Sequence, residues 1–125
     1  MLIDTDVFIW FMRGNENARK ALARQQEIIL SAITYMELIQ GLRNAMELRA
    51  LRKALHAWNA KVLYVNEEIS NRAVLYMEKH FLSHSLQLAD ALIGATASTY
   101  DLPLLTGNAR HYKVITDLTL KKFRP

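Results

Sequence analysis

The 125-residue chain contains no cysteine, and this absence excludes several kinds of chemistry at once. Without thiols there can be no disulfide, no nucleophilic cysteine, no iron–sulfur cluster and no cysteine zinc site. Glycine and proline are also scarce, with four and two residues, which excludes a collagen-like repeat. Apolar residues make up 51% of the sequence and charged residues 22%. This composition and length are typical of one globular domain, and we expect residues 1–125 to form it.

Long hydrophobic runs are absent too. No apolar stretch approaches the length that a bilayer-spanning helix requires. The first residues, MLIDTDVF, carry acids where a signal peptide carries basic residues. We therefore expect a cytoplasmic protein that has no membrane partner.

Basic residues exceed acidic residues by 16 to 12, which gives a formal net charge of +4. The excess lies in two segments, residues 43–61 and 107–125, each of which holds five Lys or Arg and a single acid. Such clusters would attract a polyanion such as RNA. From charge alone, a solubilising surface is the simpler interpretation.

Short apolar runs alternate with longer helical patterns along the chain. Strands are expected at Met1–Ile3, Ile28–Ser31, Val62–Val65 and Pro103–Thr106, with a weak one at Lys113–Ile115. Helices are expected over residues 15–26, 34–43, 45–59, 66–80 and 85–100, with a helical turn at 108–112. This alternation predicts an α/β fold with a parallel sheet between helices. In such a fold the functional cleft lies beyond the carboxyl ends of the strands.

Oxygen-bearing side chains follow three of these strands and should meet at that edge: Asp4 with Asp6, Thr34 with Glu37, and Thr106 with Asn108. Each of them also has a purely structural explanation. The two aspartates could cap the helix that follows the first strand, and Asn108 could cap its own turn. The spacing Thr34-x-x-Glu37 fits a capping box.

Asp90 is harder to explain as a structural residue. It is the only charged residue between Leu86 and Tyr100, in a segment of apolar and small side chains. Such a helix is expected to be buried, and a buried lone carboxylate is costly unless something pairs with it. A metal ion, or an Arg from a neighbouring segment, is the expected partner.

Asp4, Glu37 and Asp90, with Asp6, Thr106 and Asn108 nearby, would form an all-oxygen site. Hard oxygen ligands suit Mg²⁺ or Mn²⁺. Clustered carboxylates repel one another, so a bound cation would relieve that repulsion. Mg²⁺ held by carboxylates commonly serves phosphate chemistry, because it activates water and neutralises phosphoryl oxygens.

Four segments in order, LIDTDVFI, SAITYMEL, LADALIGATA and LLTGNARHY, give the chain a resemblance to the PIN-domain family. The chain looks like the small bacterial PIN ribonucleases that act as VapC-type toxins, and the resemblance covers essentially its whole length. It implies a PIN-like three-layer α/β/α sandwich with a central, mostly parallel sheet of four to five strands. It also implies a Mg²⁺- or Mn²⁺-dependent endoribonuclease, the toxin of a type II toxin–antitoxin system. The implied partners are an RNA substrate, a cognate antitoxin protein and a second copy in a homodimer.

The resemblance also assigns roles to individual residues. The family's invariant acids fall on Asp4, Glu37 and Asp90 as metal ligands, and its threonine falls on Thr106, which would orient an acid or a water. The family often has a further acid where this chain has Asn108, an uncharged and weaker ligand. One-metal hydrolysis that leaves 5′-phosphate and 3′-hydroxyl ends is therefore expected, and a second metal site is left open. Asp6 is a candidate auxiliary acid.

Two other functions compete with this interpretation. Asp4-Thr5-Asp6 after a first strand resembles the nucleophile motif of haloacid-dehalogenase-like phosphatases, and Thr106 resembles their second motif. That family needs a Lys and an acidic pair further on, whereas Asp117 is the only acid after Thr106. A catalytically weak PIN-like binding scaffold is the non-enzymatic alternative, and Asn108 is its only support.

The histidines are weaker candidates for function. His80 and His84 are spaced to share one helix face, but Ser83 suggests that the helix has ended by then. His56 and His111 complete the set. Nothing in the sequence groups the four at the predicted cleft, so surface positions are expected.

An aromatic run lies near the N-terminus at Phe8, Trp10 and Phe11. Phe8 is expected in the core. Trp10 and Phe11 cannot both point inward from one helical turn, so they are candidates for core, for a dimer contact or for a groove that holds a partner helix.

Overall fold

A five-stranded sheet forms the centre of the computed structural model, which describes residues 1–83 and 85–125. All strand pairs are parallel, in the order β3-β2-β1-β4-β5. The strands are β1 (Leu2–Ile3), β2 (Ile29–Ser31), β3 (Lys61–Leu63), β4 (Leu104–Thr106) and β5 (Leu120–Lys122). The predicted parallel sheet of four to five strands is confirmed.

Side chains of the strands point alternately to two separate cores, because successive residues of a strand face opposite sides of the sheet. Leu2 and Leu104 belong to one core, and their successors Ile3 and Leu105 belong to the other. Leu2, Ile3 and Leu104 are fully buried. Burial on both faces is what parallel strands require, and it explains why these short runs are apolar throughout.

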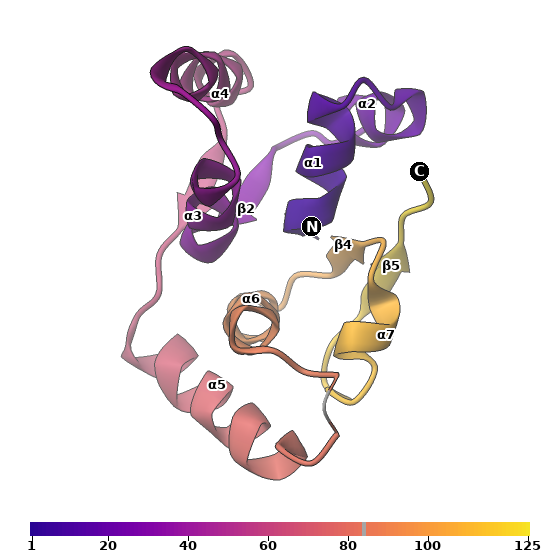
Figure 1. Ribbon diagram of the computed structural model, residues 1–125. Coiled ribbons are helices and arrows are strands. Elements are labelled where there is room, and N and C mark those ends of the chain that lie inside the picture. The colour runs from indigo at the N-terminus through magenta and orange to yellow at the C-terminus, as the bar shows by residue number, and fades with distance from the viewer. Residues whose placement is uncertain (84) are drawn as a thin grey trace.

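Helices cover both faces of the sheet and complete the three layers (Figure 1). One core contains residues of α1 (Thr5–Met12), α2 (Glu16–Ala23) and α4 (Ala45–Ala57). The other contains residues of α5 (Glu67–His80), α6 (Leu88–Thr99) and α7 (Ala109–Tyr112). Helix α3 (Ala32–Gln40) follows β2 directly. The predicted α/β/α sandwich is therefore observed.

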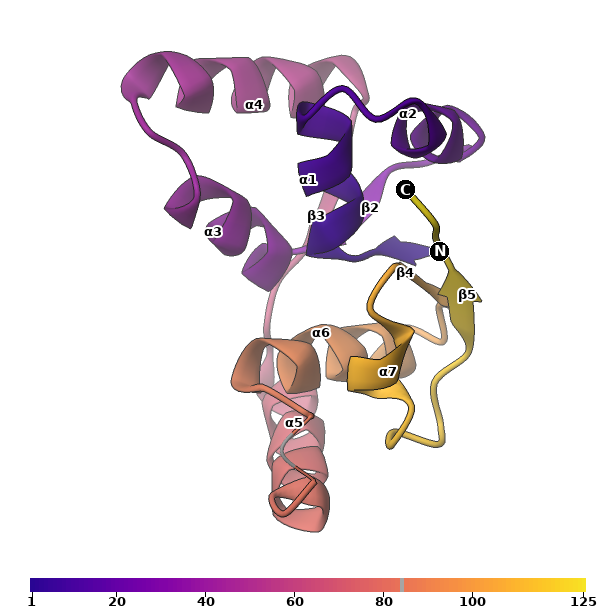
Figure 2. The same ribbon diagram turned by 45° about the vertical axis from the view of Figure 1, so that its right-hand side comes forward.

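The carboxyl ends of β1, β2 and β4 meet at one edge of the sheet, where α1, α3 and α7 begin (Figure 2). The amide of Asp4 donates to the carbonyl of Leu105 at 2.9 Å. The last residue of β4, Thr106, is fully buried. This edge therefore brings together residues from opposite ends of the chain.

One predicted strand was wrong. Residues 113 and 114 form a turn after α7, and the amide of Ile115 donates to the carbonyl of Tyr112. The apolar side chain of Ile115 packs into the core instead of forming a ladder. The fifth strand is β5, which pairs only with β4 and carries Lys121 and Lys122. Lysines are typical of an edge strand, and they hide its pattern in the sequence.

The start of α3 also differs from the prediction. Ser31 is the N-cap, and its hydroxyl accepts from the amide of Ile33 at 3.0 Å. Thr34 and Glu37 therefore lie inside the helix, and the capping-box interpretation of this pair is wrong. Among the described residues, no helix has the length and apolar character that crossing a membrane requires.

Candidate functional site

Asp4 lies at the junction of β1 and α1, and its carboxylate contacts both α1 and the distant strand β4. Its Oδ1 accepts from the amide of Thr5 at 2.8 Å, and its Oδ2 accepts from the hydroxyl of Thr106 at 2.7 Å. Asp4 is the N-cap of α1, so the structural explanation for this residue holds. The contact with Thr106 is an additional one that a helix cap does not need.

Burial raises the pKa of Asp4 from 3.8 to about 7. That pKa is the net result of all contributions: burial is the largest, the hydrogen bonds from Thr106 and Thr5 lower it, and the negative charge of Asp6 raises it. The ionised form is thus costly in this pocket near neutral pH, and a proton or a cation would relieve that cost.

Glu37 is held from two elements by threonine hydroxyls. The hydroxyl of Thr5 lies 2.6 Å from Glu37 Oε1 and 3.0 Å from the hydroxyl of Thr34. Thr5 has only one proton to donate, so it donates to the carboxylate and accepts from Thr34. Thr5 and Thr34 are both buried. This relay fixes Glu37 of α3 against the first turn of α1, beside Asp4.

Asp6 follows Thr5 in the first turn of α1 and contacts the turn after β4. Its Oδ2 accepts from the amide of Gly107 at 2.8 Å, and burial raises its pKa. Its Oδ1 is buried and has no hydrogen-bond partner among the described residues. A Cβ at Gly107 would collide with Asp6 Oδ2 and would lie 3.3 Å from the carbonyl oxygen of Phe123, so glycine is needed for this close approach.

Asp90 lies in the first turn of α6, with 15% of its side chain exposed. Its Oδ2 accepts from the amide of Gln87 at 3.1 Å, which completes a capping box at the start of the helix. His111 Nδ1 lies 3.7 Å from the same oxygen. The expected Arg partner is therefore wrong among the described residues, because a backbone amide and a histidine take that place.

Asn108 contributes through its backbone. Its amide donates to the hydroxyl of Thr106 at 2.9 Å, and so it supports the residue that holds Asp4. Its side chain is exposed and forms no capping hydrogen bond at the start of α7. The interpretation of Asn108 as a side-chain cap is therefore wrong.

Tyr112, at the end of α7, is buried at the same edge of the sheet as these carboxylates. Burial raises the pKa of Tyr112, and the charges of Asp4, Asp90 and Glu37 each raise it further. The side chain is 1% exposed, and its hydroxyl lacks a well-oriented hydrogen-bond partner among the described residues. Tyr112 therefore brings a buried hydroxyl into the electrostatic environment of the acids.

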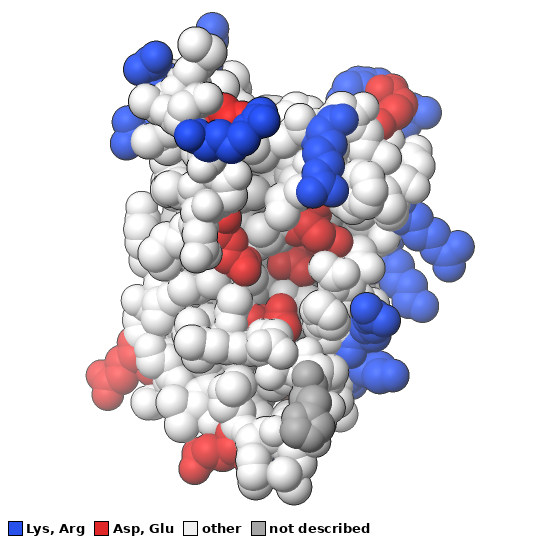
Figure 3. Space-filling model, in the orientation of Figure 1, with Lys and Arg blue, Asp and Glu red and all other residues white. Residues whose placement is uncertain are grey.

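These acids have the chemistry of a Mg²⁺ or Mn²⁺ site but do not form a closed one. Among residues 1–83 and 85–125, no three His, Asp or Glu side chains lie close enough to hold an ion directly. Figure 3 shows acidic side chains near the centre of one face. The all-oxygen donors, the buried Asp4 and the unpartnered Asp6 Oδ1 fit a cation that keeps several of its waters.

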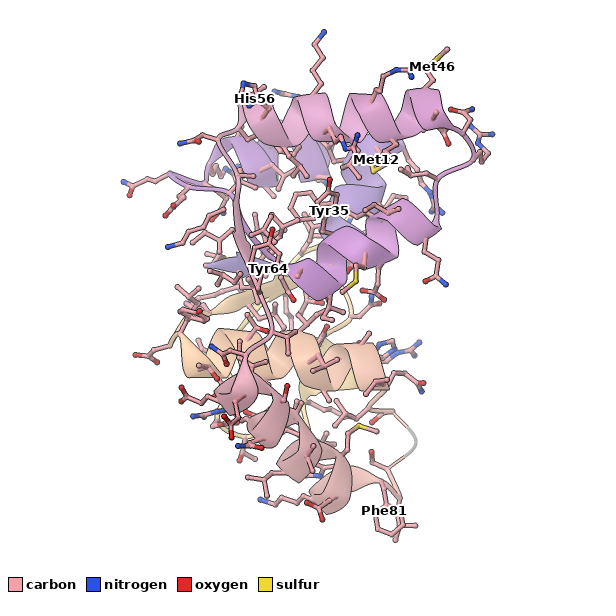
Figure 4. All side chains as sticks on the ribbon, turned by 90° about the vertical axis from the view of Figure 1, so that its left-hand side faces the viewer. Met12, Tyr35, Met46, His56, Tyr64 and Phe81 are labelled. Carbon is pink, nitrogen blue, oxygen red and sulfur yellow. The ribbon has the colours of Figure 1, made fainter. Side chains whose placement is uncertain are left out.

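The three histidines at described positions, His56, His80 and His111, do not form a second site. Among them, His111 contacts an acid, Asp90. His56 is exposed on α4 and lies near one end of the molecule (Figure 4). His80 ends α5, and the possible pairing of His80 with His84 lies outside the described residues.

The aromatic run of α1 divides between core and surface. Phe8 is buried, as predicted. Phe11 and Trp10 are both half-buried, and Phe11 packs edge-on against Trp58 with ring centroids 5.2 Å apart. Phe11 lines an apolar hollow of about 270 Å³ between α1 and α4, whereas Trp10 lies against the guanidinium of Arg13.

Sequence reasoning placed Thr34 with Glu37 at this edge but missed the roles of Thr5 and Tyr112. Thr5 lies between two candidate aspartates, and that position was the available signal. Tyr112 ends the expected helical turn at 108–112, and nothing in the sequence marked it as a neighbour of the acids.

Comparison with known proteins finds relatives over nearly the whole chain. A family model described as PIN domain matches residues 1–116. Ribonuclease VapC10 of Mycobacterium tuberculosis is 34% identical over 122 residues, which cover 94% of this chain and 90% of that protein. Ribonuclease VapC19 of the same organism is 34% identical over 124 residues, which cover 94% and 95%.

Solved structures show the same fold. The structure of VapBC-1 from nontypeable Haemophilus influenzae matches with a TM-score of 0.81 and 24% identity over 97% of this chain and 96% of that one. A toxin–antitoxin complex from Klebsiella pneumoniae matches with a TM-score of 0.75 and 27% identity over 94% of each chain.

Proposed function

This chain belongs to the PIN-domain family, and from that premise we propose that it is an endoribonuclease, the toxin of a type II toxin–antitoxin pair. One observation carries the proposal: the threonine hydroxyls of neighbouring segments hold Asp4 and Glu37 at the carboxyl edge of the sheet, Asp4 through Thr106 and Glu37 through Thr5. That edge is where α/β folds bind their ligands. The ribonuclease relatives share the fold over nearly the whole chain.

In this proposal Asp4, Glu37 and Asp90 hold a Mg²⁺ or Mn²⁺ ion, directly or through its waters. When bound, such an ion lowers the pKa of a water and neutralises charge on phosphoryl oxygens. The protein's own residues supply the positioning. Thr106 fixes Asp4, and Thr5 fixes Glu37.

Asn108 and Asp6 have supporting roles in the proposal. Asn108 holds the Thr106 hydroxyl through its amide. Asp6, whose Oδ1 has no partner among the described residues, is an auxiliary acid. The uncharged side chain of Asn108 leaves one metal ion as the simplest arrangement.

The haloacid-dehalogenase-like alternative has no support in the structure. Asp117, the only acid after Thr106, accepts hydrogen bonds from Tyr76 and Ser98. It therefore belongs to a cluster of α5 and α6, and it cannot supply that family's acidic pair at the sheet edge. The weak-scaffold alternative rests on Asn108 alone, and a cleavage assay separates it from the proposal.

Cleavage of structured RNA by the purified, partner-free protein tests the proposal. We expect cleavage with Mg²⁺ or Mn²⁺, none in EDTA, and none by Asp4→Asn. Mn²⁺ should also raise the melting temperature of the wild type, since an ion at 100 times its Kd stabilises the folded state by about 2.7 kcal/mol. Undiminished cleavage in EDTA would contradict the metal mechanism, and turnover of small phosphomonoesters alone would favour the phosphatase.

A toxic nuclease requires a protein that neutralises it, and the matched structures include a toxin–antitoxin complex. We propose that an antitoxin helix occupies the apolar hollow between α1 and α4, which Phe8, Phe11 and Trp58 line. A basic residue of the antitoxin would then pair with the acids of the candidate site, Asp4, Glu37 and Asp90. A homodimer is proposed from the family resemblance.

A further inference from the structure

Lys122 lies next to the candidate site, although nothing in the sequence connects the two. In the β4–β5 ladder Lys122 pairs in register with Thr106, the residue that holds Asp4. The amide of Phe123 donates to the carbonyl of Thr106 at 2.8 Å. The end of β5 therefore lies against the turn that borders the acids.

Two hollows meet at this point and form one basic surface. A hollow of about 390 Å³ lies against residues 106–110, and a second of about 280 Å³ lies against α2. They share Lys122, Phe123 and Arg124. Together they contain five cations, which we call the β5 basic face: Lys20, Arg24, Arg110, Lys122 and Arg124.

The charge of this face is not neutralised by the protein. Neither hollow is lined by an Asp or Glu. Within residues 1–83 and 85–125, none of the five cations forms an ion pair, whereas Arg19, Arg43 and Arg72 each do. Uncompensated cations that line a continuous surface attract a polyanion more strongly than paired ones.

The face also has a direction. In Figures 1 and 2, α2, the end of β5 and α7 follow one another along one side of the molecule, and Lys and Arg gather on that side in Figure 3. One end of this side lies at the Thr106 turn. A nucleic-acid strand that follows it would thus lead one phosphodiester toward the acids.

Two simpler explanations account for only part of the pattern. Lysines on an edge strand discourage pairing with another sheet, and Lys121 suffices for that purpose on β5. A general solubilising charge would not require α2, β5 and α7 to place their cations in adjoining hollows. The other basic segment, with Arg52 and Lys53 exposed on α4, lines neither hollow.

We infer that the β5 basic face binds the phosphate backbone of the RNA substrate and leads it into the candidate site. The inference rests on the proposed function and adds to it the surface that holds the RNA. Contacts of this kind bind phosphates rather than bases, so they should give affinity that depends on salt and little sequence preference.

Binding of a fluorescent single-stranded RNA, measured by anisotropy in EDTA so that no cleavage occurs, tests the inference. Each phosphate contact to a single strand contributes about 0.7 to the slope of log K against log salt. The Lys122→Gln/Arg124→Gln variant should lower that slope by about 1.4 and weaken binding on the order of tenfold at 0.1 M salt. Its melting temperature should stay close to that of the wild type.

The matched control is Arg52→Gln/Lys53→Gln, which loses the same charge from α4 and should bind RNA nearly as well as the wild type. Equal loss in both variants would overturn the inference, because total charge and not this face would then control binding. Unchanged RNA affinity in the β5 variant would overturn it too, even if the face proved to bind an acidic protein. Since binding is measured without metal, failure of the wild type to cleave RNA would count separately against the proposed function.

Discussion

At the scale of single residues, the buried Asp4 dominates the behaviour of the site. Its pKa of about 7 means that, between about pH 4 and 7, the folded protein holds a proton that the unfolded chain has released. Stability is therefore greatest below pH 4 as far as this group is concerned, and it falls as the pH rises to about 7. The repulsion expected among the clustered carboxylates therefore acts on Asp4 through the charge of Asp6, and burial of Asp4 adds to it.

The Asp4→Asn variant should remove this pH dependence. In EDTA at pH 8 we expect it to melt at a higher temperature than the wild type, and at pH 5 the difference should shrink. Between about pH 4 and 7, the free energy of unfolding of the wild type relative to the variant should fall by about 1.4 kcal/mol for each pH unit. Glu27→Gln, at an exposed carboxylate, serves as the control and should show no such pattern. A wild type and an Asp4→Asn variant with parallel pH profiles would refute the raised pKa.

The Thr5 hydroxyl leads to a second prediction. Thr5→Val keeps the shape but removes the donor to Glu37, and it leaves the Thr34 hydroxyl without its acceptor. We expect cleavage and Mn²⁺ affinity to fall about 10- to 100-fold, as is typical when a group that orients a metal ligand is lost. Thr5→Ser should retain most of both. Equal activity of the two variants, measured by RNA cleavage, would show that the hydroxyl has no positioning role.

At the scale of elements, Asp90 in the first turn of α6 has two roles. Asp90 caps the helix through the amide of Gln87 and also belongs to the candidate site. Asp90→Asn keeps an oxygen for the cap, whereas Asp90→Ala does not. Both should abolish cleavage, and thermal melting should show Asp90→Ala to be less stable than Asp90→Asn by about 1 kcal/mol. Equal stability would mean that the cap contributes nothing.

The hollow between α1 and α4 gives a prediction about the partner. Phe11→Ala removes a ring that lines the hollow, whereas Trp10→Ala removes one that does not. We expect Phe11→Ala to weaken the affinity for the proposed antitoxin by tenfold or more in a calorimetric titration, and Trp10→Ala to weaken it less. If neither substitution changes the affinity, the antitoxin helix binds elsewhere.

At the scale of the whole molecule, the sequence predicts what depends on local pattern. The apolar runs of β1, β2, β3 and β4 mark buried parallel strands, and the residues after them mark the functional edge. Edge strand β5 was not predicted, because its two exposed lysines interrupt the apolar pattern by which buried strands are recognised. The hydroxyl relay through Thr5, the position of Tyr112 and the register of Lys122 with Thr106 depend on contacts between distant segments, and no local pattern encodes such contacts.

The hydrogen bond between Thr106 and Asp4 spans 102 residues, and this span has a consequence for the time at which the enzyme becomes active. The ribosome releases the first strand long before the fourth, and at about 5–20 residues per second the interval lasts roughly 5–20 s. Throughout that interval Asp4 lacks the residue that fixes it, and the central strand lacks one of its two neighbours. If the proposed role of Thr106 holds, we expect the nascent chain to cleave no RNA until the fourth strand has emerged and paired. A neutralising partner that is already present has that interval in which to meet α1 before the nuclease is complete.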